Sequence, residues 1–176
     1  IKKIDKKEIE VCEVGSGSFG IGPYLKKDFI GVDLDFNEHK SAHLKPIKAS
    51  ATELPAEWTD RFDVVLSVDV LEHLSPEQRS EAIKEMIRVA NNYLILAFPT
   101  GIFARISDWI LDQYYLLTHG KRFPFLKEHR QYPLPSVNRV KNIIKKELKK
   151  PEIKVKPNTC FCLYLKLLFL GFSEIG

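Results

Sequence analysis

The sequence feature that most constrains the fold is a glycine-rich loop near the start of the chain. Residues 13–20 read Glu-Val-Gly-Ser-Gly-Ser-Phe-Gly and follow a short apolar run that ends at Cys12. A strand that breaks into glycines leaves backbone N–H groups uncovered, so that a cofactor can lie against them. Glu13 occupies a place where dinucleotide-binding loops usually have an apolar residue, and its carboxylate suits a ligand with an ammonium or sulfonium charge. Asp33 ends the next apolar run, eighteen positions after Gly15, which suits a carboxylate that receives ribose hydroxyls.

Three further blocks follow this loop in a fixed order. Gly31-Val32-Asp33 is followed by Ala-Thr-Glu-Leu-Pro at 51–55, and then by Phe-Asp-Val-Val at 62–65, which runs into Val-Leu-Glu-His at 70–73. With the glycine loop, these blocks resemble those of the class I S-adenosylmethionine-dependent methyltransferases. The resemblance extends over about the first hundred residues.

The resemblance implies that S-adenosylmethionine is the cofactor and that the glycine loop and the ends of three further strands bind it. Ser50 stands where many members of this family have an Asp that accepts a hydrogen bond from the adenine amino group, and a serine hydroxyl accepts this bond less strongly. The expected cofactor-binding residues are Glu13, Gly15, Ser16, Gly17, Phe19, Gly20, Asp33, Leu34, Ser50, Ala51, Thr52, Ser67 and Val68.

Composition and charge indicate an ordinary globular chain. The 176 residues suit a single domain, 1–176, and 44% are hydrophobic and 28% charged. The net charge of +4 is mild for a nucleic-acid-binding protein, although residues 139–156 include eight bases and two acids. Three cysteines form no disulfide or zinc pattern, and the longest apolar run, 160–172, contains Lys166 and is too short to span a bilayer. With no secretory signal at its start, the sequence predicts a cytoplasmic protein and leaves its oligomeric state open.

Apolar runs and turn residues alternate in a way that predicts a doubly wound, mostly parallel α/β sheet of the Rossmann-like methyltransferase type. A short helix is expected at 21–26. Ser75, Pro76 and Gln78 form the pattern of an N-cap, a first helical residue and a capping box, so a longer helix is expected from 76 to 90. The expected strands are 9–14, 29–33, 44–49, 62–68 and 93–98.

The stretch after the fifth strand, residues 102–135, differs from the rest in its aromatic and proline content. Apolar residues at spacings of three and four predict an amphipathic helix in its first half, and 121–135 has a loop-like composition. We expect this stretch to be an inserted lid over the acceptor pocket, as insertions at this place are in the resembling family. A helix at 136–148 and a sixth strand at 153–156 should follow. Residues 159–170 fit a strand or a helix, and their leucine-rich composition with Gly171 at the end favours the helix, which leaves the C-terminal edge of the sheet incomplete.

His73 is the candidate catalytic residue, because an imidazole titrates near neutral pH and can remove a proton from an oxygen or nitrogen acceptor. The expected reaction is methyl transfer to a small-molecule or glycan-type acceptor, with a nucleic-acid acceptor less favoured. Asp69, Glu72 and His73 also resemble the ligands of metal-assisted RNA and quinone-precursor O-methyltransferases, although no metal ligand is assigned. Two further functions stay open, those of an NAD(P)-dependent oxidoreductase and of a non-catalytic cofactor-binding scaffold.

Overall fold

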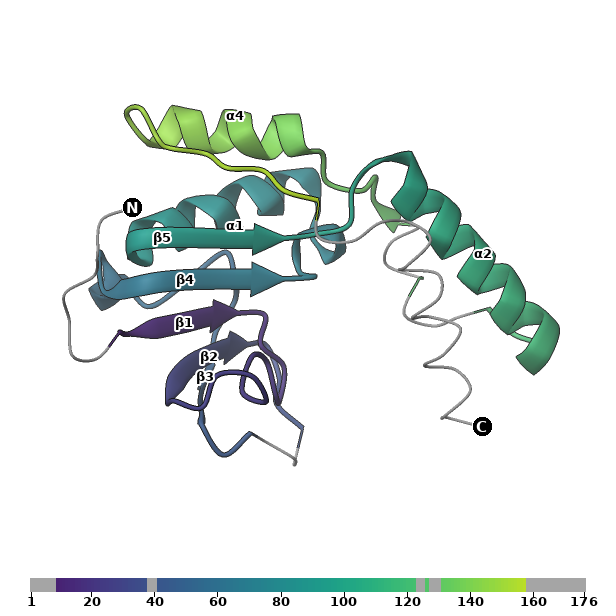
Figure 1. Ribbon diagram of the computed structural model, residues 1–176, viewed down its shortest axis with the longest axis horizontal. Coiled ribbons are helices and arrows are strands. Elements are labelled where there is room, and N and C mark those ends of the chain that lie inside the picture. Colours follow the sequence, from purple (N-terminus) through teal and green to yellow (C-terminus); the bar gives the residue numbers. More distant parts are fainter. Residues whose placement is uncertain (1–8, 38–40, 123–125, 127–130, 158–176) are drawn as a thin grey trace.

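The computed structural model describes residues 9–37, 41–122, 126 and 131–157. Five parallel strands form one sheet with the order β3-β2-β1-β4-β5, as Figure 1 shows. This sheet confirms the predicted α/β fold with a parallel sheet, and β2 and β4 have the predicted bounds. The strands are β1 (Val11–Val14), β2 (Phe29–Asp33), β3 (Leu44–Lys48), β4 (Phe62–Val68) and β5 (Ala90–Ala97).

The order of the strands reverses at β1, which pairs with β2 on one side and β4 on the other. The registers place Val14 opposite Val32, and Glu13 opposite both Gly31 and Leu66. The chain winds outward from β1 through β2 to β3 and then, on the other side, from β4 to β5. Since parallel strands bind ligands at the carboxyl ends beside such a reversal, the ends of β1, β2 and β4 define the place to look for a site.

Helix α1 (Pro76–Val89) covers β4 and β5, and α4 (Val137–Glu147) packs on α1. The predicted capping box is confirmed, since Ser75 Oγ accepts from Gln78 N and Gln78 Oε1 accepts from Ser75 N. Two short 3₁₀ turns, η1 (Ala56–Trp58) and η2 (Leu71–His73), flank β4. The core between this face of the sheet and the two helices includes Cys12, Val14, Val32, Phe62, Val65, Ile83 and Met86, all fully buried or nearly so.

The prediction of a helix at 21–26 is wrong, because residues 17–24 form consecutive turns. Gly17 and Gly20 have φ angles of 52° and 46°, in the left-handed region, which ends any right-handed helix at those positions. Pro23 lacks an N–H, and the few residues that remain are too short to nucleate a helix alone.

The fifth strand starts earlier than predicted, at Ala90 instead of residue 93. Ala90 caps α1 with extended angles (φ −84°, ψ 125°), and Asn92 Nδ2 donates to Asp63 Oδ1 at 2.9 Å. Asn91 and Asn92, which lie between the predicted helix and the predicted strand, therefore belong to β5. The third strand ends at Lys48, one residue early.

The sixth strand expected at 153–156 is also wrong, since residues 151–157 have no regular structure. Pro151 and Pro157, at the two ends of this segment, have no N–H to donate to a sheet ladder. The helix expected at 159–170 lies outside the described residues, and among these residues the sheet ends at β5.

Helix α2 (Gly101–His119) confirms the helix predicted in the first half of the inserted stretch. It ends at His119 and is capped by Gly120, which has a left-handed φ of 66°. Figure 1 shows α2 beyond the carboxyl ends of the strands, projecting from the body that the sheet and the other helices form. Of the expected loop-like part, the structure describes 121–122, 126 and 131–135, and Leu126 and Gln131 are helical. Within the described ranges, no helix is long and apolar enough to cross a membrane.

Candidate active site

The glycine loop leaves β1 in a chain of turns that backbone hydrogen bonds hold against β2. Gly15 N and Ser16 N both donate to Val32 O, at 2.7 and 3.1 Å, and Gly20 N donates to Ser16 O at 2.8 Å. Gly15 has a φ of 82°, and a Cβ at this position would collide with Val70, in the segment after β4. The loop, the end of β2 and the segment after β4 therefore lie together at the carboxyl end of the sheet.

Glu13 lies beneath this loop instead of on its surface, with only 3% of its area exposed. Its Oε2 accepts a hydrogen bond from Ile21 N at 2.7 Å, and Gly20 passes so close that a Cβ there would clash with the carboxylate. Burial raises the pKa of the Glu13 carboxyl above its ordinary value, and the bond from Ile21 opposes this effect. Glu13 thus shapes the loop from below and places an acid under it.

Asp33 joins the end of β2 to the glycine loop. Oδ2 accepts from Gly17 N at 2.8 Å, and Oδ1 accepts from Leu34 N at 2.7 Å. Oδ1 also accepts from Asp35 N at 3.4 Å. Because a carboxylate has about four acceptor positions, two on each oxygen, Oδ2 is the oxygen that retains capacity for a further donor. Leu34 follows with 66% of its area exposed, and Phe19, within the glycine loop, is 52% exposed.

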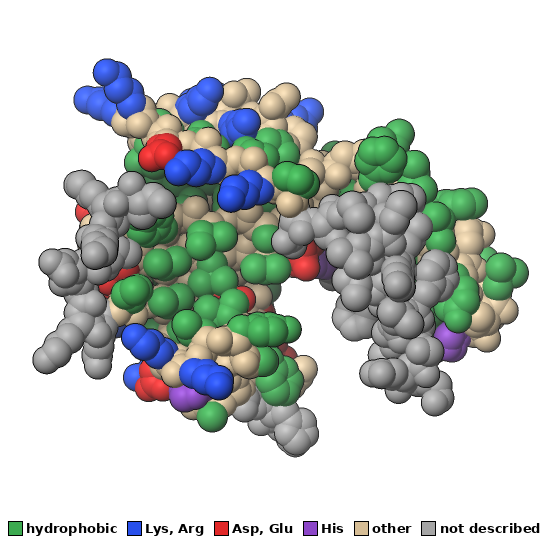
Figure 2. All heavy atoms as spheres, in the orientation of Figure 1, with side chains coloured by type: hydrophobic (Ala, Val, Ile, Leu, Met, Phe, Trp, Pro, Cys, Tyr) green, Lys and Arg blue, Asp and Glu red, His purple; other side chains and the backbone are tan. Residues whose placement is uncertain are grey.

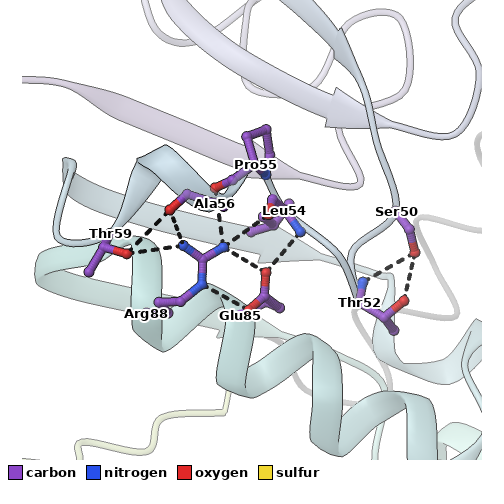
Figure 3. Close-up of polar contacts among 8 residues, drawn as sticks. All are labelled: Ser50, Thr52, Leu54, Pro55, Ala56, Thr59, Glu85 and Arg88. Carbon is purple, nitrogen blue, oxygen red and sulfur yellow. Dashed lines mark hydrogen bonds and ion pairs between the residues drawn. The ribbon is translucent and has the colours of Figure 1, made fainter.

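Residues 50–52 after β3 form a turn whose side chains bond to each other. Ser50 Oγ and Thr52 Oγ1 are 2.8 Å apart, and Thr52 N donates to Ser50 Oγ at 3.2 Å (Figure 3). Ala49 N donates to Asp33 O at 3.1 Å, which holds the start of this turn beside the end of β2. The Ser50 hydroxyl therefore has an intramolecular partner in this structure.

A pair of charged side chains from α1 fastens the chain that follows this turn. Arg88 and Glu85 form an ion pair at 2.7 Å, and Glu85 Oε2 accepts from Leu54 N at 2.9 Å (Figure 3). The Arg88 guanidinium also donates to carbonyl oxygens of the same chain segment. The hydrogen bond from Arg88 holds the pKa of Glu85 below its ordinary value, and the same bond raises the pKa of Arg88.

The last two residues of β4 differ in their exposure. Val68 is 39% exposed, whereas Ser67 is 2% exposed and its hydroxyl has no partner in the described structure. In η2, which follows, Glu72 is 1% exposed while the His73 side chain is exposed. The described residues contain no group of three side chains able to hold a metal ion, so Asp69, Glu72 and His73 are not gathered as such a site.

Two side chains that sequence reasoning missed connect this end of the sheet to the inserted stretch. Arg79 is 6% exposed, and its Nε donates to Leu71 O at 2.6 Å while Nη1 donates to Pro133 O at 2.7 Å. Burial lowers the pKa of Arg79. Thr100 Oγ1 donates to Pro135 O at 2.8 Å and joins the two ends of the insertion. No spacing or motif marks either residue, because both partners are backbone carbonyls far along the chain.

Two cavities lie along α2, between this helix and the chain that follows it. One, of about 500 Å³, is lined by residues that include Arg105, Trp109, Asp112 and Tyr132. The other, of about 420 Å³, is lined by Ile102 and by two arginines, Arg105 and Arg139, among others. The cofactor-binding residues expected from the sequence line neither of these two cavities.

The chain also matches a known family. The model of the methyltransferase domain matches residues 12–96, which include the glycine loop, Asp33, the turn at 50–52 and the end of β4. No curated protein matches the sequence.

Solved structures show where this fold occurs. The chain is similar to the PH0226 protein from Pyrococcus horikoshii OT3, with 19% identity and a TM-score of 0.60 over 84% of this chain and 78% of that one. It is similar to the CurJ carbon methyltransferase, with 19% identity and a TM-score of 0.55 over 87% of this chain and 46% of that one. It is also similar to phosphoethanolamine N-methyltransferase 2 from Haemonchus contortus, solved with S-adenosyl-L-methionine, with 18% identity and a TM-score of 0.52 over 81% of this chain and 33% of that one. The chain thus spans about half or less of the length of these last two proteins.

The family match and the fold agree with each other. Residues 12–96 match the methyltransferase domain, and the parallel sheet is shared with solved methyltransferases, so both findings support the resemblance to the class I S-adenosylmethionine-dependent methyltransferases that the sequence indicates.

Proposed function

We propose that this domain transfers the methyl group of S-adenosylmethionine to an oxygen or nitrogen of a small-molecule or glycan-type acceptor. The observation that carries the proposal is the hydrogen bond from Gly17 N to Asp33 Oδ2 at 2.8 Å, beside the reversal in strand order. It joins a glycine loop and a carboxylate at the place where parallel sheets bind nucleotide-like ligands. The fold neighbours include a carbon and a nitrogen methyltransferase, so they do not decide the acceptor atom. We propose oxygen or nitrogen because these acceptors lose a proton, and His73 is the residue predicted to remove it.

The residues present fit this cofactor. A Cβ built on Gly17 would meet no atom within 4 Å, so the backbone of the loop faces open space in which a ligand can approach closely. Asp33 Oδ2 has acceptor capacity for a ribose hydroxyl. Phe19, Leu34 and Val68 offer exposed apolar surface for an adenine ring, and Glu13 places negative charge beneath a cationic ligand. In the proposed complex these residues, with Gly15, Ser16, Gly20 and the 50–52 turn, hold the cofactor.

The bound cofactor supplies an activated methyl group, which leaves the chain to align the acceptor, exclude water and remove a proton. His73 is exposed in η2, which follows the end of β4, and we assign to it the removal of the proton from the acceptor. We propose that residues 102–135 form the lid of a single domain, because Thr100 and Pro135 close the insertion at its base and Arg79 joins it to Leu71, two residues before His73.

The test of the cofactor assignment is calorimetry on two neighbouring acids. Asp33→Ala removes an acceptor of hydroxyl hydrogen bonds, each contributing about 1.5–3 kcal/mol when the acceptor is charged, so affinity for S-adenosylmethionine should fall at least about tenfold. Asp35→Ala is the matched control, because Asp35 is an acid of the same size two residues away, with 86% of its side chain exposed. Equal affinities for the two variants would remove Asp33 from the site. Titration of the wild type with NAD⁺ and NADP⁺ in the same series tests whether the domain is instead an oxidoreductase.

His73 has its own test, which measures turnover. His73→Gln should lower kcat by about 10²- to 10⁴-fold, the contribution typical of a positioned general base, while affinity for the cofactor stays unchanged. An unchanged kcat would show that His73 has no part in proton transfer. Loss of activity in chelator, with recovery on adding Mg²⁺ or Mn²⁺, would instead favour the metal-assisted reaction. Wild-type binding without turnover over a broad acceptor screen would favour the scaffold.

A further inference from the structure

Helix α2 presents its apolar side to solvent and its polar side to the protein. Five large apolar side chains are exposed: Ile102 (68%), Phe103 (62%), Ile106 (39%), Trp109 (64%) and Leu117 (85%). The buried residues of the same helix are Ser107, Leu111 and Asp112. A helix on the surface of a globular protein normally has the opposite arrangement.

The five exposed residues share one side of the helix. At 3.6 residues per turn they fall within an arc of about 120°, which we name the outer face of α2. Ile110, half-buried, lies in the same arc, and Gln113 is its one polar residue. Figure 2 shows hydrophobic side chains along this projecting end of the molecule. A contiguous apolar surface on a projecting helix marks a place where the protein contacts something other than water.

Cations border the outer face of α2 at both of its ends. At the start of the helix, Arg105 and Arg139 line the same 420 Å³ cavity as Ile102. Just after its end, Lys121 is exposed, whereas the guanidinium of Arg122 pairs with Asp112 on the side of α2 toward the protein. The acids of α2 lie away from this face. Asp112 is 4% exposed and accepts from Arg122 Nη1 at 2.8 Å, and Asp108 is half-buried in the cavity that Trp109 also lines.

We propose that the outer face of α2 is a membrane-binding surface that lies in the interface of an anionic bilayer. A convex apolar helix enters a lipid interface without a groove to receive it, and aromatic and aliphatic side chains flanked by arginine and lysine are the composition of helices that lie in that interface. Each basic residue near an anionic surface adds about a fivefold gain in binding. A second copy of this chain would instead have to provide a matching groove. The inference stands independently of the proposed methyl transfer.

The protein contains a built-in probe for this test. Of its two tryptophans, Trp58 is 4% exposed in the core and Trp109 is 64% exposed on the outer face of α2. The whole chain is mixed with vesicles of phosphatidylcholine alone and of phosphatidylcholine with an equal amount of phosphatidylglycerol. We expect a blue shift of tryptophan emission and co-sedimentation with the anionic vesicles, both weakened by salt.

Two matched variants connect binding to this face. Leu117→Glu should lower the partition coefficient at least tenfold, since it replaces a leucine that enters the interface with a charge of the same sign as the lipid. Tyr24→Glu makes the same change in charge at a side chain that is 87% exposed elsewhere, against 85% for Leu117, and should bind as the wild type does. Circular dichroism confirms that both variants are folded.

Three results would overturn the proposal. They are absence of binding to the anionic vesicles, equal binding by Leu117→Glu and Tyr24→Glu, and a wild-type dimer that Leu117→Glu converts to a monomer in sedimentation equilibrium. The last result would show that a second copy covers the outer face of α2. A fourth result, equal binding to both kinds of vesicle, would overturn the assignment of an anionic bilayer.

Discussion

Arg88 should contribute more to the stability of this domain than any surface charge on the same helix. Its guanidinium donates to both Glu85 oxygens at 2.9 and 2.7 Å, and to Leu54 O and Pro55 O at 3.0 and 3.2 Å (Figure 3). It also donates to Ala56 O and Thr59 Oγ1, both at 3.3 Å. One side chain thus connects α1 to residues 54–59 of the segment between β3 and β4. Arg88→Ala removes all of these bonds together.

The magnitude follows from the burial of the pair. A charged hydrogen bond contributes about 1.5–3 kcal/mol net, and breaking a fully buried pair costs about 3–5 kcal/mol. The Arg88 and Glu85 side chains are 27% and 22% exposed, so water screens the pair in part and solvates some of the released carbonyls. We therefore expect Arg88→Ala to lower the free energy of unfolding by about 2–4 kcal/mol, which corresponds to a Tm lower by about 4–16 °C for a chain of this size.

Lys84→Ala is the control, one helical turn earlier on α1. Lys84 is 53% exposed and 3.6 Å from Glu147, so its removal should cost about 1 kcal/mol or less. Urea unfolding monitored by circular dichroism measures both variants. Equal losses at the two positions, with equal m-values, would refute the reasoning, because they would mean that the bonds of Arg88 add nothing beyond a surface charge.

The same pair predicts how this loss varies with pH. Because the pKa of Glu85 lies below its ordinary value of 4.5 in the folded protein, its ionised form adds stability above that value and loses it as pH falls through the folded pKa. The difference in stability between wild type and Arg88→Ala should therefore be full at neutral pH and shrink below pH 4.5. A difference that stays constant on acidification would mean that the ion pair does not cause it.

Two further changes test the glycine loop and the base of the insertion. Gly20→Ala should lower the free energy of unfolding by about 2 kcal/mol or more, because its φ of 46° is strained for alanine and its Cβ would strike the buried Glu13 carboxylate. Gly17→Ala is its control, since its φ is 52° but no atom lies within 4 Å of the Cβ, so only the strain of about 1–2 kcal/mol should appear. Chemical unfolding without ligand measures both, and equal costs would contradict the collision. Thr100→Val removes the bond to Pro135 O at 2.8 Å and should raise the KM for acceptor while affinity for cofactor stays unchanged. Thr118→Val, which removes a hydroxyl bonded within α2, is its control, and equal KM values would show that the base of the insertion does not affect the acceptor.

Elements specified by short-range chemistry were predictable from the sequence. The capping box at Ser75 and Gln78 placed the start of α1, since its bonds join residues three apart. The strands 29–33 and 62–68 were placed because buried parallel strands are continuous apolar runs bounded by polar residues. The glycine and acid spacing likewise predicted that Asp33 would stand beside the loop, and Gly17 N bonds to it.

Other features depend on contacts between distant residues, and no local pattern contains them. Arg79 bonds a carbonyl at Pro133, fifty-four positions away, and any residue can supply a carbonyl. Glu13 was predictable as an acid of the site, but its burial depends on how closely Gly20 and Ile21 fold over it.

Helix α2 shows most clearly which features the sequence determines and which depend on the tertiary structure. Periodicity in the sequence determined that residues 102–117 form a helix with one apolar side, because a 3.6-residue repeat is a property of the chain alone. Only the tertiary structure decided that this side faces outward. The orientation of a helix about its own axis depends on what it packs against, and Asp112 and Ser107 lie on the side toward the protein.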